Sequence, residues 1–113
     1  MAYDEGLAQR VRGELAGEPG LTEKKMFGGL GFMLEGNMAV AASSQGGLLL
    51  RVPPERTGDL AAEPHAGPFE MRGKAMDGWL RVDADGVASD EDLRRWVAIG
   101  VEHVRTLPPK PPT

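Results

Sequence analysis

Residues 24–42 read KKMFGGLGFMLEGNMAVAA, and this stretch indicates the fold more clearly than any other part of the chain. Apolar side chains alternate over residues 30–34 and again over residues 38–42, with the period of two that is typical of β-strands. Glu35-Gly36-Asn37 separates the two runs, and Gly and Asn accept the positive φ that a tight turn requires. The stretch therefore predicts a β-hairpin, and a further strand at residues 22–26 precedes it.

The glycines at positions 28, 29 and 31 lie between predicted strands. Phosphate-binding loops need glycines that lead into a helix, with a lysine after them, whereas here the lysines come first. Glycine inside a strand pattern usually marks a bend or a bulge. We therefore interpret Met26, Phe27, Gly28 and Gly29 as a structural motif.

The rest of the chain supplies helices and more strands. Leu7, Val11 and Leu15 recur every four residues, which predicts an amphipathic helix, and Ser89 with Asp92 resembles a capping box. Helices are predicted at residues 3–16, 54–62 and 90–107, and strands at residues 22–26, 30–34, 38–42, 48–52, 69–72 and 79–82. This order, α-β-β-β-β-α-β-β-α, predicts an α+β domain with a mostly antiparallel sheet and helices on one face.

The composition limits the classes of function. The chain has 113 residues, no cysteine and a net charge of −4. One domain at residues 1–107 is expected, followed by a proline-rich tail at residues 108–113. The lack of cysteine excludes disulfides and thiol nucleophiles, and the acidic balance makes direct nucleic-acid binding the least favoured function. No apolar run is long enough to cross a membrane, so we expect a cytoplasmic protein.

The sheet face opposite the helices is the candidate interaction surface. Alternation assigns the helix-covered face to Leu30, Phe32, Leu34, Met38, Val40, Ala42, Leu48, Leu50, Val52, Leu80 and Val82. The other face receives Met33, Ala39, Ala41, Leu49, Arg51, Trp79 and Arg81. A face in bulk water would carry more charge, so a symmetric partner, the tail or a ligand is expected to cover it, the alternative being a mildly apolar exposed sheet. The predicted interaction residues are Met33, Leu49, Arg51, Trp79 and Arg81.

A few polar residues are candidates for sites of chemistry. Lys24 and Lys25 are a candidate anion contact, although consecutive strand residues face opposite sides. His65 and His103 are interpreted as surface residues, with no acid and nucleophile recognisable beside either. Residues 81–92 match part of a calcium loop, but Arg81 occupies its first ligand position, so a turn and a helix cap are the preferred interpretation. We expect no catalytic residue, no metal and no cofactor.

Several motifs, taken in order and spacing over nearly the whole chain, resemble the N-terminal domain of the TfoX/Sxy family. They are Lys24-Lys25-Met26-Phe27-Gly28-Gly29, Gly36-Asn37-Met38, Arg51-Val52, Gly73-Lys74-Ala75-Met76 with Gly78-Trp79, and Leu93 through Trp96-Val97 to Leu107-Pro108. The resemblance implies a secretion-chaperone-like α+β fold in which dimers are common. Founding members of that family regulate natural competence together with a cyclic-AMP receptor protein, and they carry a second, C-terminal domain of helical hairpins. The family implies no catalytic residues.

The expected function follows from the face and the resemblance together. We expect a stand-alone TfoX-like module, non-enzymatic and homodimeric, that acts through protein contacts with a partner in the transcription machinery. The alternative is a binder of anionic small molecules, or a minor enzyme, that uses Arg51, Arg81 and one of the lysines.

Overall fold

The predicted hairpin lies within a single sheet. The computed structural model describes residues 4–26, 29–43, 46–71 and 73–109. Six strands in the order β1-β2-β3-β4-β6-β5 form the described sheet, and every neighbouring pair is antiparallel. The strands are β1 (Leu21–Met26), β2 (Gly29–Leu34), β3 (Asn37–Ala42), β4 (Leu48–Arg51), β5 (Ala66–Met71) and β6 (Lys74–Val82).

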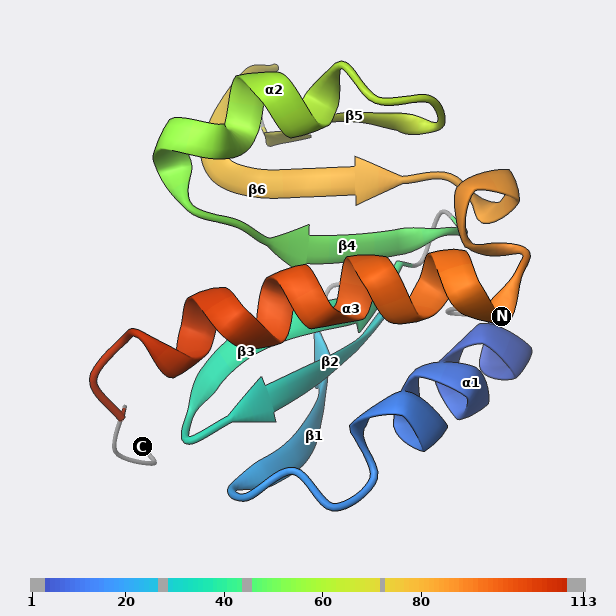
Figure 1. The fold of residues 1–113 in the computed structure, drawn as a ribbon, viewed down its shortest axis with the longest axis vertical. Coiled ribbons are helices and arrows are strands. Elements are labelled where there is room, and N and C mark those ends of the chain that lie inside the picture. The colour runs from blue at the N-terminus through green and yellow to red at the C-terminus, as the bar shows by residue number, and fades with distance from the viewer. Residues whose placement is uncertain (1–3, 27–28, 44–45, 72, 110–113) are drawn as a thin grey trace.

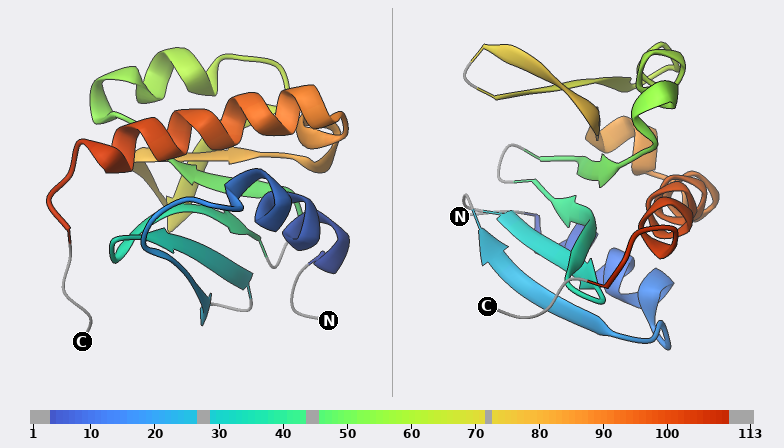
Figure 2. Two further views of the ribbon diagram at one scale, coloured as in Figure 1. Left: turned by 60° about the horizontal axis from the view of Figure 1, so that its bottom comes forward. Right: turned by 90° about the vertical axis from the view of Figure 1, so that its left-hand side faces the viewer.

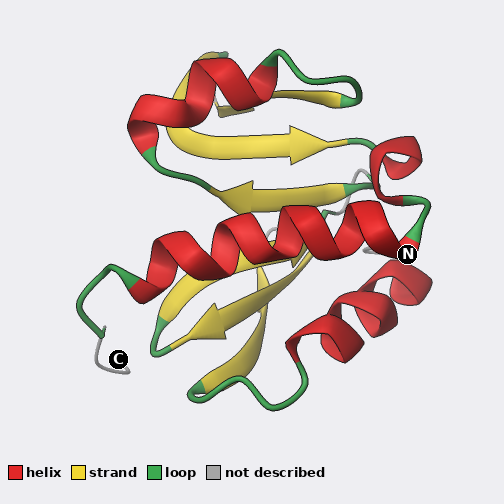
Figure 3. Ribbon diagram, in the orientation of Figure 1, coloured by secondary structure: helices red, strands yellow, loops and turns green. Residues whose placement is uncertain are grey.

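Three α-helices pack on one face of this sheet. They are α1 (Glu5–Leu15), α2 (Thr57–Ala61) and α3 (Asp90–Arg105), with single 3₁₀ turns at Pro54–Arg56 and Ala84–Val87. The long α3 lies across β3 and β4, α1 lies beside it, and α2 covers β5 and β6 (Figure 1, Figure 3). The side view in Figure 2 shows the helices on one side of the strands. The predicted α+β class and element order are confirmed.

The helix ends have the caps that the sequence indicates. The Asp4 carboxylate accepts a hydrogen bond from the Leu7 backbone N–H at 3.1 Å and so begins α1. The Ser89 hydroxyl oxygen accepts one from the Asp92 N–H, also at 3.1 Å, and so begins α3. Each cap satisfies a backbone donor that has no partner inside the helix.

The predicted connection between the last two strands is wrong. Residues 73–78 were expected to link two short strands, but β6 begins at Lys74, and β5 begins at Ala66 rather than at residue 69. A tight turn explains the difference: Gly73 has φ of +77°, and Met71 at the end of β5 already pairs with Lys74 at the start of β6. The predicted helix start at residue 3, the bend at residues 27–28, the turn at residues 44–45, the strand end at residue 72 and the tail at residues 110–113 lie outside the described residues.

A β-bulge shifts the alternation along β3. Phe32 lies opposite Val40, but its neighbour Met33 lies opposite Met38, which leaves Ala39 as an extra residue. Two expectations are therefore wrong. Ala39 was assigned to the face away from the helices but is fully buried in the core, and Met38 was assigned to the core but pairs with Met33 and is half-buried. One inserted residue moves every following side chain to the other face.

The bulge lies directly under α3. A Cβ at Gly100 would lie 2.7 Å from the Ala39 carbonyl oxygen, so only glycine lets the helix approach this closely. The shift also turns Asn37 toward the helix side, opposite Leu34. The Asn37 side-chain amide donates to the Pro108 carbonyl at 3.0 Å, which ties the chain after α3 to the start of β3.

The core fills the space between the sheet and the helices. Its largest fully buried side chains come from α1, α3, four strands, the residue after β4 and the 3₁₀ turn at Ala84–Val87, and the strand contributions follow the predicted alternation outside the bulge. They include Phe32, Leu34, Val40, Leu48, Leu50, Leu80, Leu93, Val11 and Leu15.

Candidate functional site

The sheet face opposite the helices, called the outer face below, carries the candidate surface. Paired residues in neighbouring strands share a face. The register therefore places on the outer face Met33, Met38, Ala41, Leu49, Arg51, Trp79 and Arg81. Apart from Ala41, which is buried, all of them are half-buried, and no described helix packs on this side (Figure 2).

Four of these residues form a compact group on β4 and β6. Leu49 lies opposite Arg81, and Arg51 lies opposite Trp79, so the four occupy the corners of a square, with the arginines on one diagonal. We call Leu49, Arg51, Trp79 and Arg81 the β4–β6 quartet. The Arg51 guanidinium carbon lies 5.5 Å from the centre of the Trp79 ring, which is cation–π geometry. Arginine side chains are cations, so the quartet carries two positive charges beside an aromatic ring.

A row of small residues extends from the quartet across the sheet. Leu49 pairs with Ala41, Ala41 with Gly31, and Gly31 with Lys24 on the edge strand β1. The side chains in the middle of this row are a methyl group and a hydrogen. Ala41 and Gly31 are both buried, so the row is accessible at its ends, at half-buried Leu49 and exposed Lys24.

Met33, the fifth predicted interaction residue, lies apart from the quartet. It belongs to β2 and pairs with Met38 beside the bulge, so the structure separates it from β4 and β6. Met38 joins the surface only because of that bulge, and the period-two pattern missed it for this reason.

The two candidate lysines lie on opposite sides of β1. Lys24 pairs with Gly31 and belongs to the outer face, whereas Lys25 pairs with the core residue Leu30. Both are exposed. The structure does not bring them together as one anion contact, and only Lys24 shares a face with the quartet.

Glu23 points from β1 to the helix side. The Arg12 guanidinium donates to both Glu23 carboxylate oxygens, at 2.6 and 2.8 Å. This hydrogen-bonded pair holds the pKa of Glu23 below its ordinary value. The contact joins α1 to the edge strand and removes one acidic side chain from the neighbourhood of Lys24 on the outer face.

The glycine-rich motif is placed only in part. Met26 ends β1 and pairs with Gly29 at the start of β2, and Gly29 is buried. Phe27 and Gly28 lie outside the described residues. Met26 and Gly29 belong to two paired strands and to no helix, which agrees with a structural role and not with a phosphate loop.

Arg51, at the end of β4, has an electrostatic effect on His103 of α3. His103 of α3 has its pKa lowered, first because burial disfavours the imidazolium ion and second because the positive Arg51 is near, while Glu55 acts in the opposite direction. His103 is therefore partly buried and electrostatically linked to the outer face, which the surface interpretation of this histidine did not anticipate.

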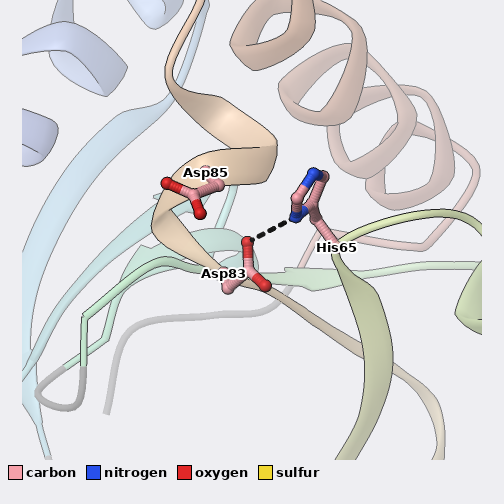
Figure 4. A group of neighbouring side chains, drawn as sticks. All are labelled: His65, Asp83 and Asp85. Atoms are coloured by element: carbon pink, nitrogen blue, oxygen red, sulfur yellow. Dashed lines mark ion pairs between the residues drawn. The ribbon is translucent and has the colours of Figure 1, made fainter.

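His65 is a surface residue, as the sequence predicted, and it has an acidic neighbour that the sequence did not indicate. His65 Nδ1 lies 3.2 Å from Asp83 Oδ1, and Asp85 is next to them (Figure 4). The pairing of β5 with β6 causes this proximity, because Ala66 lies opposite Val82 and the next residues outward are His65 and Asp83. All three side chains are exposed. The partial match of residues 81–92 to a calcium loop, which contains Asp83 and Asp85, is a sequence signal for this site, but their histidine could not be found without the strand register.

The fold and the surface define the class of this protein. It is an α+β domain built on one antiparallel sheet, with helices on one face and an arginine–tryptophan surface on the other. The family model of the TfoX N-terminal domain matches residues 14–104. The chain therefore belongs to the TfoX N-terminal domain family, as its motifs predicted. Neither a curated protein nor a solved structure matches it. Among the described residues, no helix is long and apolar enough to cross a membrane.

Proposed function

We propose that this chain is a non-enzymatic TfoX-type module that regulates transcription in the cytoplasm by binding another protein through the outer face. The β4–β6 quartet is the observation that supports this proposal. Trp and Arg are the residue types most enriched among side chains that dominate interface energies, and here both arginines adjoin the tryptophan. The family supports a regulatory role in general and names no partner.

The geometry of the quartet suits binding before any partner arrives. Its four side chains are half-buried and stand on paired strands, so their backbone positions are rigid. The Arg51–Trp79 contact restricts the arginine further. Ordering a free arginine at an interface costs about 0.5–1.5 kcal/mol, and a side chain already held in place avoids part of that cost.

The charge of the quartet indicates the chemistry of the partner. Two of the four side chains of the quartet are cationic, and none of the four is a carboxylate. A complementary partner surface presents Asp or Glu side chains around an apolar pocket for Trp79. A symmetric dimer through the same quartet would bring four guanidinium groups together, so we assign the quartet to a different protein. The homodimer predicted from the sequence stays a prediction.

The same side chains explain why the proposal is non-enzymatic. Arginine, tryptophan and leucine side chains are not the groups that act as general acids or bases in catalysis. The quartet can bind and orient an anionic group, but it lacks a nucleophile and a general base.

The first test is capture of partners by tagged protein from the lysate of its own cell. The expected partner is an RNA polymerase subunit or a transcription factor, recovered by the unaltered protein and identified by mass spectrometry. The double variant Arg51→Ala/Arg81→Ala and the variant Trp79→Leu should each lose it. Arg56→Ala is the matched control, because Arg56 is exposed in the 3₁₀ turn before α2 and is not part of the quartet. The captured protein is then purified and its dissociation constant measured.

The outcomes separate the proposal from its competitors. Loss of binding by at least about tenfold in both quartet variants, with Arg56→Ala unchanged, supports the proposal. Equal binding by all variants overturns it. Light scattering on the purified chain shows whether it dimerises, and a dimer that Trp79→Leu converts to monomers would assign the quartet to self-association instead.

An anionic small molecule is the second candidate for the quartet. The diagonal arrangement of Arg51 and Arg81 favours it, because two guanidinium groups on one surface can share a phosphate or carboxylate. A thermal-shift screen of anionic metabolites tests this candidate, since a ligand that binds the native state raises its stability. Nucleic-acid binding would instead show affinity that falls steeply with salt concentration.

A further inference from the structure

We propose that His65, Asp83 and Asp85 form a binding site for a first-row divalent cation, with Zn²⁺ as the ion that fits best. One ligand atom from each residue lies within 4.8 Å of the other two. Zinc binds imidazole nitrogen and carboxylate oxygen at about 2.0–2.2 Å, so two ligands of one ion lie about 3–4 Å apart. His65 Nδ1 and Asp83 Oδ1 already have that separation, at 3.2 Å (Figure 4).

The backbone holds the three residues in position without the ion. The Asp83 N–H donates to the His65 carbonyl at 2.9 Å, so the two residues form the last link between β5 and β6. Asp83 Oδ1 also accepts from the Gly86 N–H at 3.1 Å and begins the 3₁₀ turn that contains Asp85. Both carboxylates are thereby directed by one short turn, and His65 reaches them from the neighbouring strand.

The turn packs closely against the histidine. A Cβ on Gly86 would lie 2.6 Å from the Cβ of His65, so glycine is required for this approach. His65 itself has φ of +67°, in the left-handed region that non-glycine residues seldom adopt. Two backbone features therefore position the imidazole, and its ligand nitrogen lies within 4.8 Å of the ligand oxygens of both carboxylates.

The donor set selects the type of ion. One imidazole nitrogen with two carboxylate oxygens suits zinc and its first-row neighbours. Calcium takes six to eight oxygen ligands, and magnesium requires an octahedral shell of oxygens. Three protein ligands leave a further position that water can occupy, because the site is exposed. Bound zinc would join the end of the β5–β6 ladder to the turn that leads into α3.

The test is a calorimetric titration of the untagged full chain with Zn²⁺ and, separately, with Mg²⁺. We expect one Zn²⁺ per chain and weaker binding of Mg²⁺. His65→Asn removes the imidazole but keeps a residue type that tolerates a left-handed backbone. Asp85→Asn removes one carboxylate, and Asp83→Asn removes the other while retaining a side-chain oxygen that can cap the turn. Each should weaken Zn²⁺ binding by at least about tenfold, because loss of even an outer-shell partner costs about 10–100-fold.

The control variants are His103→Gln and Asp77→Asn, which remove a histidine and an exposed carboxylate elsewhere on the chain. Zinc affinity unchanged in both, together with a melting temperature that Zn²⁺ raises in the unaltered protein and not in His65→Asn, supports the site. Zinc affinity equal in the unaltered protein, His65→Asn and Asp85→Asn would overturn it. If Asp83→Asn does not fold, the His65 and Asp85 variants still decide the outcome, because neither side chain caps the turn.

Discussion

The two faces of the sheet are made by the same strands and differ sharply. On the helix face of β4 and β6, Leu48, Leu50, Leu80 and Val82 are fully buried. On the outer face of the same strands, Leu49, Arg51, Trp79 and Arg81 are half-buried, and two of the four are cations. Alternate residues of one strand therefore have different roles. One set supplies the apolar burial that stabilises the fold, and the other set is available for binding.

The largest expected effect is a difference in stability loss between two neighbouring residues that lie on opposite faces of β2. Phe32→Ala removes a fully buried ring and is expected to lower the free energy of unfolding by about 3–5 kcal/mol. Met33→Ala removes a half-buried side chain from the outer face and should cost less than half as much. Urea denaturation of both variants checks this, and equal losses would mean that the outer face carries as much of the stability as the core.

The next effect tests the contact between α3 and the bulge in β3. A Cβ at Gly100 would press on the Ala39 carbonyl oxygen and come within 3.1 Å of Val40 Cγ1. Gly100→Ala should therefore destabilise the fold by about 1–3 kcal/mol, despite the better helix propensity of alanine. The matched control is Gly13→Ala in α1, where no neighbouring atom lies within 4 Å of the added Cβ. That change should stabilise by about 0.5–1 kcal/mol. Equal gains at both positions would show that α3 does not contact the bulge.

The smallest expected effect is on the pH dependence of stability, through His103. Its folded pKa lies below its unfolded value of about 6.5, so the unfolded chain binds more protons between the two values. The contribution of His103 to the stability of the fold is fully present above the unfolded pKa. It is lost as the pH falls through the folded pKa. The free energy of unfolding, measured by denaturation at several pH values between 5 and 8, should therefore depend less on pH in His103→Gln than in the unaltered protein.

Arg51→Met provides the cross-check. Because the positive Arg51 helps to lower the pKa of His103, its removal should raise that pKa in an NMR titration. An unchanged pKa would mean that burial alone is responsible and that the outer face has no electrostatic influence on α3.

The fold was largely predictable because its signals are local. The spacing of Leu7, Val11 and Leu15, the Ser89 cap and the turn at residues 35–37 each need only a few neighbouring residues, and each is present in the structure. The quartet was predictable in membership for the same reason, since alternation along β4 and β6 identifies its face. That it forms a square requires β4 to pair with β6 rather than with β5, and this pairing is a property of the whole sheet.

The errors arose where a distant segment determines the local geometry. The bulge at Ala39 is compatible with the close packing of Gly100, which lies far along the chain on α3. A strict period of two therefore misassigned both Ala39 and Met38. The early starts of β5 and β6 have a local origin instead, because the tight turn at Gly73 lets the two strands pair directly.

The sequence by itself determined the element types, most of the core and the family, because these depend on side-chain periodicity, caps and motifs that short segments carry. Only the tertiary structure decided which residues become neighbours across strands: Arg51 with Trp79, Met33 with Met38, and His65 with Asp83. The physical reason is that strand order and register result from burying all the apolar faces at once. A binding surface or a metal site made from several strands exists only once that strand order and register have formed.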